Sequence, residues 1–332
     1  MNELSALATD ERSARMVLAN IVEPGDILTG RVLAHAGAVE TVRALTEEGT
    51  VPGMGEVEAR LWRSHLPRQV DTQQVAETTA RAEREGFGTL IPGDRDFPTS
   101  LDDLGVERPY LLWVKGHASL LSGSLDNRFT ITGSRDGTAY GVEVAGGIAA
   151  DLARDEKIVV SGGGFGIDAA AHRAALMEAG HTIAVIASTG DRPHAGLLER
   201  IADVGLVVSE TPPGSPPTRT RVLARARIEA ALSAATTVVE SGPRSSALAV
   251  AARAHELGRG VGAVPGSVLG IMSSGTNALL CDGTARAVTN ANDITELGAT
   301  PTANRQPPRP CGYGTPERRT LKAHRPIEHR DL

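Results

Sequence analysis

The feature that most constrains the fold is an alternation, from Arg128 onward, of short β-branched runs with longer segments rich in Ala and Leu. Each run suits a buried strand, and segments such as Tyr140–Ala153 and Ala169–Ala179 are long enough for crossover helices. Strands separated by helices pair in parallel, and the helices cover both faces of the sheet. We therefore predict a doubly wound α/β domain over residues 128–298, with strands at Phe129–Thr132, Ile158–Val160, Thr182–Ala187, Leu206–Val208, Thr237–Val239 and Val261–Val264.

The residues on either side of this domain have a different pattern. From Glu11 to Glu85 apolar side chains recur at helical spacing, and Pro–Gly pairs interrupt them. The end of the chain is rich in Pro and Arg and poor in apolar side chains, which is typical of disorder. We predict a small helical domain over residues 1–85, a connector with a short strand over residues 86–127, and a disordered, basic tail over residues 299–332.

Composition narrows the possible functions. A net charge of -6 argues against a protein that coats duplex DNA through general positive charge, so a nucleic-acid ligand would need a local pocket. The two cysteines, Cys281 and Cys311, do not suffice for a disulfide framework or a thiolate metal site, and we predict Cys281 to be a core residue. The chain begins without a secretion signal and has no long apolar run, so we expect a cytoplasmic protein without a membrane span.

Two loops that follow predicted strands carry residues suited to an anion. Gly133-Ser134-Arg135 offers close backbone approach, a hydroxyl and a guanidinium that fits a phosphate. Ser161 to Asp168 reads Ser-Gly-Gly-Gly-Phe-Gly-Ile-Asp and would present backbone amides at a helix N-terminus. Its G-x-G-x-G spacing departs from the dinucleotide fingerprint, which weakens an NAD site without excluding it. A tight strand-to-helix turn without a ligand explains the same glycines, and Asp168 also suits the first turn of a helix.

No catalytic or metal-binding group accompanies these loops in the sequence. We find no nucleophile beside a base, no carboxylate pair at helical spacing and no metal-ligand cluster. His172 and His181 lack partners at ligand spacing, so we expect them at the surface or in packing. The sequence therefore predicts a binding protein that is not an enzyme and that needs neither metal nor cofactor.

Several ordered motifs from about Glu11 to Leu297 resemble the DprA/Smf family of DNA-processing proteins, in the version found in high-GC Gram-positive bacteria. They are Gly133-Ser134-Arg135 with Tyr140-Gly141, Ser161 to Asp168 with Ala171-His172, Ser209 to Gly214, Leu223 to Ile228, and Gly258-Arg259 with Ala263 to Gly266. The resemblance implies a SAM-like helical domain and an extended Rossmann-like domain that forms a homodimer. It also implies that the protein binds and protects single-stranded DNA in natural transformation and loads RecA recombinase on it.

The resemblance further implies which residues contact the single-stranded DNA. Arg135 would contact a phosphate, and Arg225 and Arg227 would add charge unless they belong to a solvated helix face. Phe165 would stack on a base or fill the space beneath its loop. The complete predicted set is Gly133, Ser134, Arg135, Ser161, Gly162, Gly163, Gly164, Phe165, Gly166, Asp168, Arg192, Arg225 and Arg227.

This chain departs from the family pattern at several positions. Ala226 replaces the asparagine of an Arg-Asn-Arg motif, and Ser246 replaces a glycine, which matters if that position needs a positive φ. Glu229 stands where an apolar residue is usual and needs a partner such as Arg253 if it is buried. The segment 190–197 is shorter than in the family, and the residues after Leu297 do not suffice for the winged-helix domain that many members carry.

Two other functions share the predicted fold. One alternative is an enzyme with a related fold that hydrolyses nucleotide phosphoribosyl bonds. Such enzymes carry a Pro-Gly-Gly-x-Gly-Thr-x-x-Glu motif that supplies the catalytic glutamate. The nearest tract here, Val264 to Ser267, lacks both the second glycine and the glutamate, which argues against hydrolysis. A domain that senses nucleotides would keep the glycine loop, Ser161 to Asp168, as a phosphate site without binding DNA. Its affinity would depend only weakly on salt, whereas affinity for a DNA strand falls steeply with salt.

Overall fold

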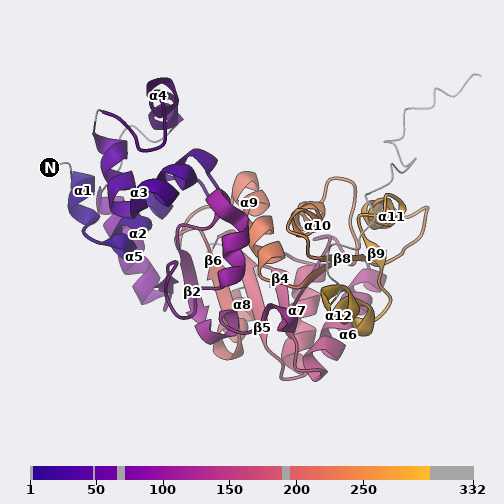
Figure 1. The fold of residues 1–332 in the computed structure, drawn as a ribbon. Helices are drawn as coiled ribbons and strands as arrows, with labels where there is room; N and C mark the ends of the chain where they lie inside the picture. The colour runs from indigo at the N-terminus through magenta and orange to yellow at the C-terminus, as the bar shows by residue number, and fades with distance from the viewer. Residues whose placement is uncertain (1–2, 48, 66–71, 189–194, 300–332) are drawn as a thin grey trace, which may run out of the picture.

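The structure is a computed structural model that describes residues 3–47, 49–65, 72–188 and 195–299. A helical N-terminal part lies beside one edge of a nine-stranded sheet, and the last helices lie at the opposite edge (Figure 1). The predicted basic tail lies outside the described residues. None of the helices in the described ranges is long and apolar enough to span a membrane.

The N-terminal part is helical, as predicted. Its second and third helices begin where aspartates cap them, because Asp10 accepts a hydrogen bond from the Ser13 amide and Asp26 from the Thr29 amide. Gly37, with φ of +77°, kinks the third helix. The helices are α1 (Glu3–Leu7), α2 (Glu11–Ile21), α3 (Ile27–Thr46), α4 (Glu56–His65) and α5 (Thr72–Arg84).

The sheet has the strand order β1-β2-β6-β5-β4-β3-β7-β8-β9. All pairs from β6 to β9 are parallel, whereas β2 pairs antiparallel with β1 and with β6. The predicted connector therefore contributes two strands to the sheet, because its apolar run at residues 111–114 covers the open edge of β6. The strands are β1 (Gly88–Leu90), β2 (Leu112–Gly116), β3 (Arg128–Thr132), β4 (Ile158–Gly162), β5 (Thr182–Ile186), β6 (Leu206–Ser209), β7 (Ala235–Val238), β8 (Gly260–Ala263) and β9 (Arg286–Ala287).

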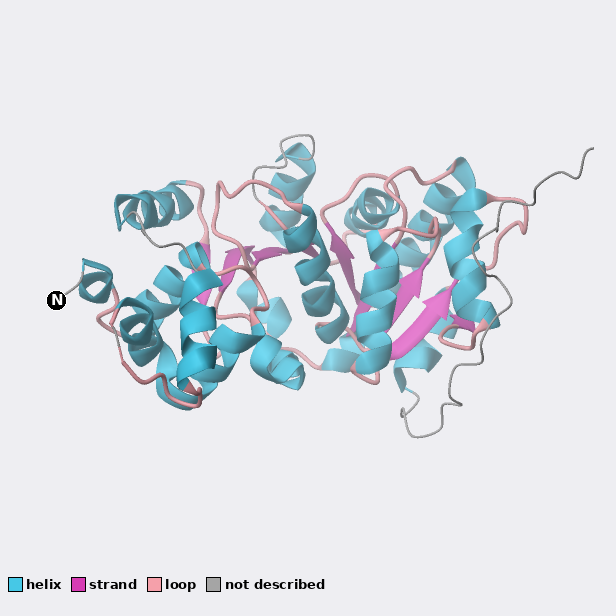
Figure 2. Cartoon of the chain, turned by 90° about the horizontal axis from the view of Figure 1, so that it is seen from above, coloured by secondary structure: helices cyan, strands magenta, loops and turns pink. Residues whose placement is uncertain are grey.

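Helices cover both faces of the sheet (Figure 2), as the sequence predicted. On one face α6 (Ala139–Arg154), α7 (Ile167–Met177) and α12 (Ala291–Ala299) share a core with the side chains of β3 and β4. Next to them α8 (Ala195–Val204) packs on β5 and β6. On the other face α9 (Arg219–Ala231) and α10 (Ser246–Glu256) pack on β5, β7 and β8. The strands and the two helices predicted in this domain are confirmed, with β7 beginning two residues earlier than expected and α7 beginning and ending two residues earlier.

The strand order reverses beside β3. The chain passes from β3 through β4 and β5 to β6 on one side, then returns to place β7 on the other side of β3. The loops that follow β3 and β7 lead to helices on opposite faces, α6 and α10. Their divergence leaves a crevice at the carboxyl ends of these strands, where doubly wound sheets bind ligands.

Our prediction that Cys281 is a core residue is wrong. This cysteine ends α11 (Ser274–Cys281) and is exposed. Leu279 and Leu280 are the residues of its last turn that pack against the cluster beneath α10. The core position is therefore taken by leucines, and the smaller cysteine faces outward.

Candidate nucleic-acid interface

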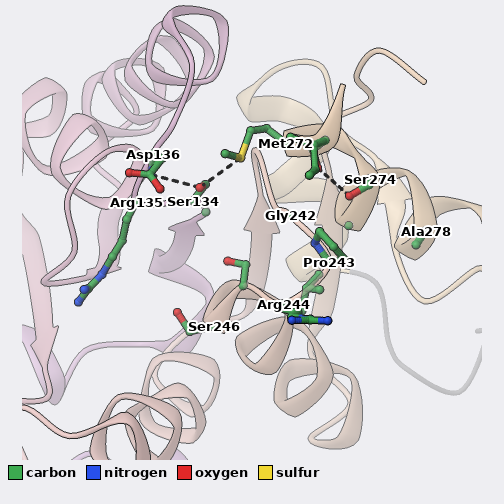
Figure 3. Close-up of a pocket in the computed structure, with 15 residues that line it drawn as sticks. Ser134, Arg135, Asp136, Gly242, Pro243, Arg244, Ser246, Met272, Ser274 and Ala278 are labelled. Carbon is green, nitrogen blue, oxygen red and sulfur yellow. Dashed lines mark hydrogen bonds between the residues drawn. The ribbon is translucent and has the colours of Figure 1, made fainter. Parts of the chain in front are cut away.

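Two hollows meet at the crevice between β3 and β7. The larger one, here called the switch-point cavity, has a volume of about 1120 Å³ and is lined by the loops after β3 and β7 and by residues 271–278 (Figure 3). The smaller one, here called the arginine cleft, has a volume of about 500 Å³ and also includes the start of α9. Arg135, Arg244 and Ser246 line both, so the two hollows adjoin at these three residues.

Three exposed arginines surround the arginine cleft: Arg135, Arg219 and Arg244. None of them has an ion pair or a side-chain hydrogen bond to the part of the chain that the structure describes, and no carboxylate lines the cleft. By contrast, Arg221 in the same turn of α9 forms an ion pair with Glu23. The cleft is thus a local positive site on a chain whose net charge is -6, which is the kind of site that a nucleic-acid ligand would need on such a chain.

The loop after β3 is fixed by its neighbours. A Cβ atom on Gly133 would lie 2.7 Å from Ile167 Cγ1 and 2.8 Å from the Glu240 carbonyl oxygen, so only glycine fits. The Ser134 amide donates to that same carbonyl at 2.8 Å, and Ser134 Oγ lies 3.5 Å from Met272 Sδ. Ser134 is nearly buried, and the tethered loop leaves Arg135 as its exposed cation.

The glycine loop between β4 and α7 is held by a carboxylate of the protein. Asp168 Oδ2 accepts the Gly164 amide at 3.1 Å, and Oδ1 accepts a hydrogen bond from Thr132 Oγ1 at 3.0 Å. Gly166 has φ of +67°, and a Cβ there would clash with the Arg135 carbonyl oxygen. The tight-turn interpretation thus accounts for Gly166, and Asp168 orders the loop. An anion cradle formed by the remaining amides stays a prediction.

A second carboxylate, which the sequence analysis missed, occupies the N-terminus of α6. Glu240 lies two residues after the end of β7, and its Oε2 accepts a hydrogen bond from the amide of the capping residue Thr138 at 2.8 Å. Its Oε1 accepts a hydrogen bond from Thr138 Oγ1 at 2.7 Å. The positive N-terminal end of α6, next to the Gly133-Ser134-Arg135 loop, is therefore neutralised by a carboxylate of the protein itself. The arginines, and not this helix end, supply the positive charge of the site.

The other predicted residues of the glycine loop differ in exposure. Ser161 is fully buried and donates to the Ile131 carbonyl at 2.6 Å, so its hydroxyl has a structural role. A Cβ on Gly163 would meet Ile186 Cγ2 at 2.7 Å, and one on Gly162 would lie 2.5 Å from Arg225 Nη2. Phe165 is 46% exposed, so the interpretation as a plug beneath the loop is wrong. Its ring can meet a ligand from solvent.

The interpretation of Arg225 and Arg227 as a solvated helix face is also wrong. Arg227 is 2% exposed, and its guanidinium donates to Glu210 Oε1 at 2.6 Å and to the Glu107 carbonyl at 2.8 Å. It fastens α9 to the segment before β2 and does not line the arginine cleft. Arg225 lies under the glycine loop, where its Nη2 is 4.0 Å from Asp168 Oδ2.

Glu229 has a different partner from the one we predicted. Its carboxylate is fully buried, and its Oε1 lies 2.6 Å from Arg225 Nε. The expected partner, Arg253, instead pairs with Glu107 and Glu256. Arg225 is one helical turn before Glu229, so the pair forms within α9. Burial raises the pKa of the Glu229 carboxyl to about 7, although the Arg225 cation opposes this shift.

The other departures from the family pattern have local explanations. Ala226 is buried between α9 and α10, where an amide side chain would need a buried partner. Ser246 begins α10 without a positive φ, so its replacement of glycine brings no strain there. Arg192 and most of the shortened segment 190–197 lie outside the described residues.

Two of the three cleft arginines, Arg219 and Arg244, were absent from the predicted set. Arg244 follows β7, whose carboxyl end lies beside that of β3, so the strand order was the signal that the sequence did not reveal. Arg219 begins α9 because Thr218 caps that helix by accepting a hydrogen bond from the Arg221 amide.

His172 is buried in packing, between the Gly162 carbonyl and Thr182 Oγ1. Within the described ranges no group of three or more His, Cys, Asp or Glu could hold a metal ion.

Comparisons with known proteins give matches over the sheet domain. The family described as DNA recombination-mediator protein A matches residues 88–298. DprA of Mycobacterium tuberculosis strain H37Rv is 46% identical over 247 residues, which are 70% of this chain and 63% of that protein. This chain thus spans less than two thirds of that relative. DNA processing protein DprA of Streptococcus pneumoniae is 34% identical over 225 residues, 67% of this chain and 78% of that protein.

Solved structures share the fold. The X-ray structure of DNA processing protein A from Streptococcus pneumoniae has a TM-score of 0.66 at 26% identity, covering 86% of this chain and 96% of that chain. A structure of DNA processing protein A from Helicobacter pylori, described for its single-stranded DNA binding mode, has a TM-score of 0.56 at 27% identity and covers 63% of this chain and 94% of that chain. These matches confirm the predicted helical part followed by a Rossmann-like sheet.

Proposed function

Because this chain belongs to the family of DNA recombination-mediator protein A, the DprA/Smf family that its motifs predicted, we propose that it binds single-stranded DNA through the arginine cleft. The observation that carries the proposal is the group of three exposed arginines without protein partners in the described ranges, Arg135, Arg219 and Arg244, around one cleft. Guanidinium groups bind phosphate oxygens in a fixed fork geometry, and a strand backbone presents a phosphate at each nucleotide.

The charge distribution favours a single strand over a duplex. The chain as a whole is acidic, so a rigid duplex that extends beyond the cleft meets a surface of net negative charge. A flexible single strand can bend into the cleft and keep its contacts local. The single-stranded DNA binding mode described for the Helicobacter pylori protein supports the same ligand class.

Other expectations from the family resemblance enter as proposals. The glycine loop adjoins the loop that carries Arg135, because the Ile167 amide donates to the Ser134 carbonyl, and its amides would hold the strand backbone. The exposed ring of Phe165 would stack on a base. Transfer of the bound strand to RecA recombinase, a homodimer and a cytoplasmic location are further parts of the proposal. The arginines supply binding energy for a strand without a chemical step, so no catalytic residue belongs to it.

Fluorescence anisotropy with a labelled oligothymidine tests the proposal. Each DNA phosphate that the protein neutralises makes the plot of log affinity against log salt concentration steeper by about 0.7. The triple substitution of Arg135, Arg219 and Arg244 by Ala should therefore make the slope shallower by about 2. Arg200→Ala, which removes an exposed arginine on α8, is the matched control and should keep the wild-type slope. Equal affinity and slope for the triple variant and wild type would refute the arginine cleft as the binding site.

A further inference from the structure

We propose that Glu229 sets the affinity of the glycine loop for DNA, because a phosphate bound at the loop amides favours the protonated form of this buried carboxyl. The inference rests on the proposed function and concerns charges that lie behind the glycine loop and not those of the arginine cleft. Its chemistry is the uptake of a proton at Glu229 when a phosphate binds. Three side chains that are 10% exposed or less carry it: Glu229, Arg225 and Asp168.

The three side chains form a row of charges that ends at the glycine loop. Glu229 Oε1 lies 2.6 Å from Arg225 Nε, and Arg225 Nη2 lies 4.0 Å from Asp168 Oδ2. The same Oδ2 accepts a hydrogen bond from the Gly164 amide at 3.1 Å. A Cβ atom on Gly162 would lie 2.5 Å from Arg225 Nη2, so the guanidinium lies directly against the loop backbone. The charge of this row therefore acts on the remaining loop amides, which would hold a phosphate.

The net charge of the row depends on the protonation of Glu229. When Glu229 is ionised, two carboxylates share one guanidinium and leave a negative charge behind the loop, which repels a phosphate. When Glu229 is protonated, Arg225 and Asp168 balance each other. In the described part of the chain neither carboxyl oxygen of Glu229 has a hydrogen bond of good geometry, so only the Arg225 cation favours the ionised form against burial. Burial raises the pKa of Glu229 to about 7, so both forms are populated at neutral pH.

The other groups around α9 leave Glu229 as the titrating member of this row. On the sheet side Thr130 Oγ1 donates to the Glu229 carbonyl at 3.0 Å, and the residues of β5 and α10 that share clusters with α9 are apolar. His172 on α7 is another titratable side chain at the loop, since its Nε2 lies 3.0 Å from the Gly162 carbonyl oxygen. It is common to wild type and a Glu229 variant, so comparing the two isolates Glu229. The remaining charged side chains around α9 have partners of their own: Arg227 with Glu210, and Arg253 with Glu107 and Glu256.

Proton linkage gives the direction of the effect. A bound phosphate disfavours the ionised form and so raises the pKa of Glu229 above its value in the unbound protein. Affinity is therefore highest below about pH 7, and it falls as pH rises from that value to the pKa of the bound state. The family pattern has an apolar residue at this position, so the coupling belongs to this chain and not to the family.

Anisotropy titrations of labelled oligothymidine at pH 6 and pH 8.5, at one salt concentration, test the inference. Glu229→Gln and wild type should bind equally at pH 6. At pH 8.5 Glu229→Gln should bind about three- to tenfold more tightly, because its amide cannot ionise. Glu199→Gln is the matched control: it removes a carboxylate from an exposed ion pair with Lys115 and should bind like wild type at both pH values.

A second measurement needs no variant. Calorimetric titration of wild type with oligothymidine at pH 7.5, in two buffers of different ionisation enthalpy, should show net proton uptake on binding, because the bound state holds the Glu229 proton more tightly. Wild type alone thus tests the coupling even if Glu229→Gln does not fold.

The outcomes separate this inference from the proposed function. The same affinity ratio between Glu229→Gln and wild type at both pH values overturns the inference, because a purely structural effect of the substitution changes affinity alike at both. Absence of proton uptake by wild type overturns it as well. In either case the salt dependence of the triple arginine variant still decides the proposed function. If wild type binds oligothymidine at neither pH, both proposals fail.

Discussion

Substitution of Glu229 by glutamine should stabilise the protein at neutral and alkaline pH. Neither carboxylate oxygen of Glu229 has a hydrogen bond of good geometry to the described part of the chain, although Arg225 Nε is 2.6 Å from Oε1. Asp168, the other nearby carboxylate, raises the pKa further. Two carboxylates and one guanidinium therefore share a buried site, which leaves one negative charge without compensation. Glutamine removes that charge and keeps the shape of the side chain.

The magnitude follows from the difference in pKa between the folded and unfolded states. A rise from 4.5 to about 7 corresponds to about 3 kcal/mol, because each pKa unit is worth about 1.4 kcal/mol. Between these two values the folded state binds more protons than the unfolded state, so the wild type loses stability as pH rises from about 4.5 to about 7. The amide that replaces the carboxyl in Glu229→Gln cannot ionise, so the variant does not show this loss.

Urea denaturation of both proteins at pH 5 and pH 8 measures the effect. The stability of Glu229→Gln relative to wild type should increase by about 2 to 3 kcal/mol between these two pH values. Glu199→Gln is the control, because Glu199 forms an exposed ion pair with Lys115, and its substitution should change stability by less than about 1 kcal/mol at either pH. If the difference between Glu229→Gln and wild type is the same at both pH values, or the variant is less stable at pH 8, the reasoning is refuted.

Two further substitutions test the assigned roles of site residues. Arg227→Ala leaves the buried Glu210 carboxylate without its ion pair and should lower the free energy of unfolding, measured by urea denaturation, by about 3 to 5 kcal/mol. The control Arg221→Ala breaks an exposed ion pair with Glu23 and should lower it by less than about 1 kcal/mol. Equal losses for the two variants would contradict the structural role of Arg227. Phe165→Ala should weaken oligothymidine binding by about fivefold or more at an unchanged urea midpoint, and unchanged affinity would exclude base stacking by this ring.

Much of the fold and part of the site could be predicted from local sequence patterns. The alternation of β-branched runs with Ala-rich segments predicted the strands and helices of the sheet domain. Glycines at Gly133 and Gly166 marked the turns that follow β3 and β4, because close backbone approach and positive φ are properties of single positions. The same pattern placed Arg135 at the carboxyl edge of the sheet.

Only the tertiary structure decided which charges remain available to a ligand. The sequence places Arg225, Arg227 and Arg219 along one helix, and nothing in their spacing distinguishes the two buried arginines from the exposed one. Burial and pairing depend on residues far along the chain: Glu210 meets Arg227 through the fold, and Arg244 reaches the cleft because β7 lies beside β3. Local sequence determines where strands, helices and turns begin, whereas the order of strands determines which side chains are neighbours and therefore which arginines are neutralised.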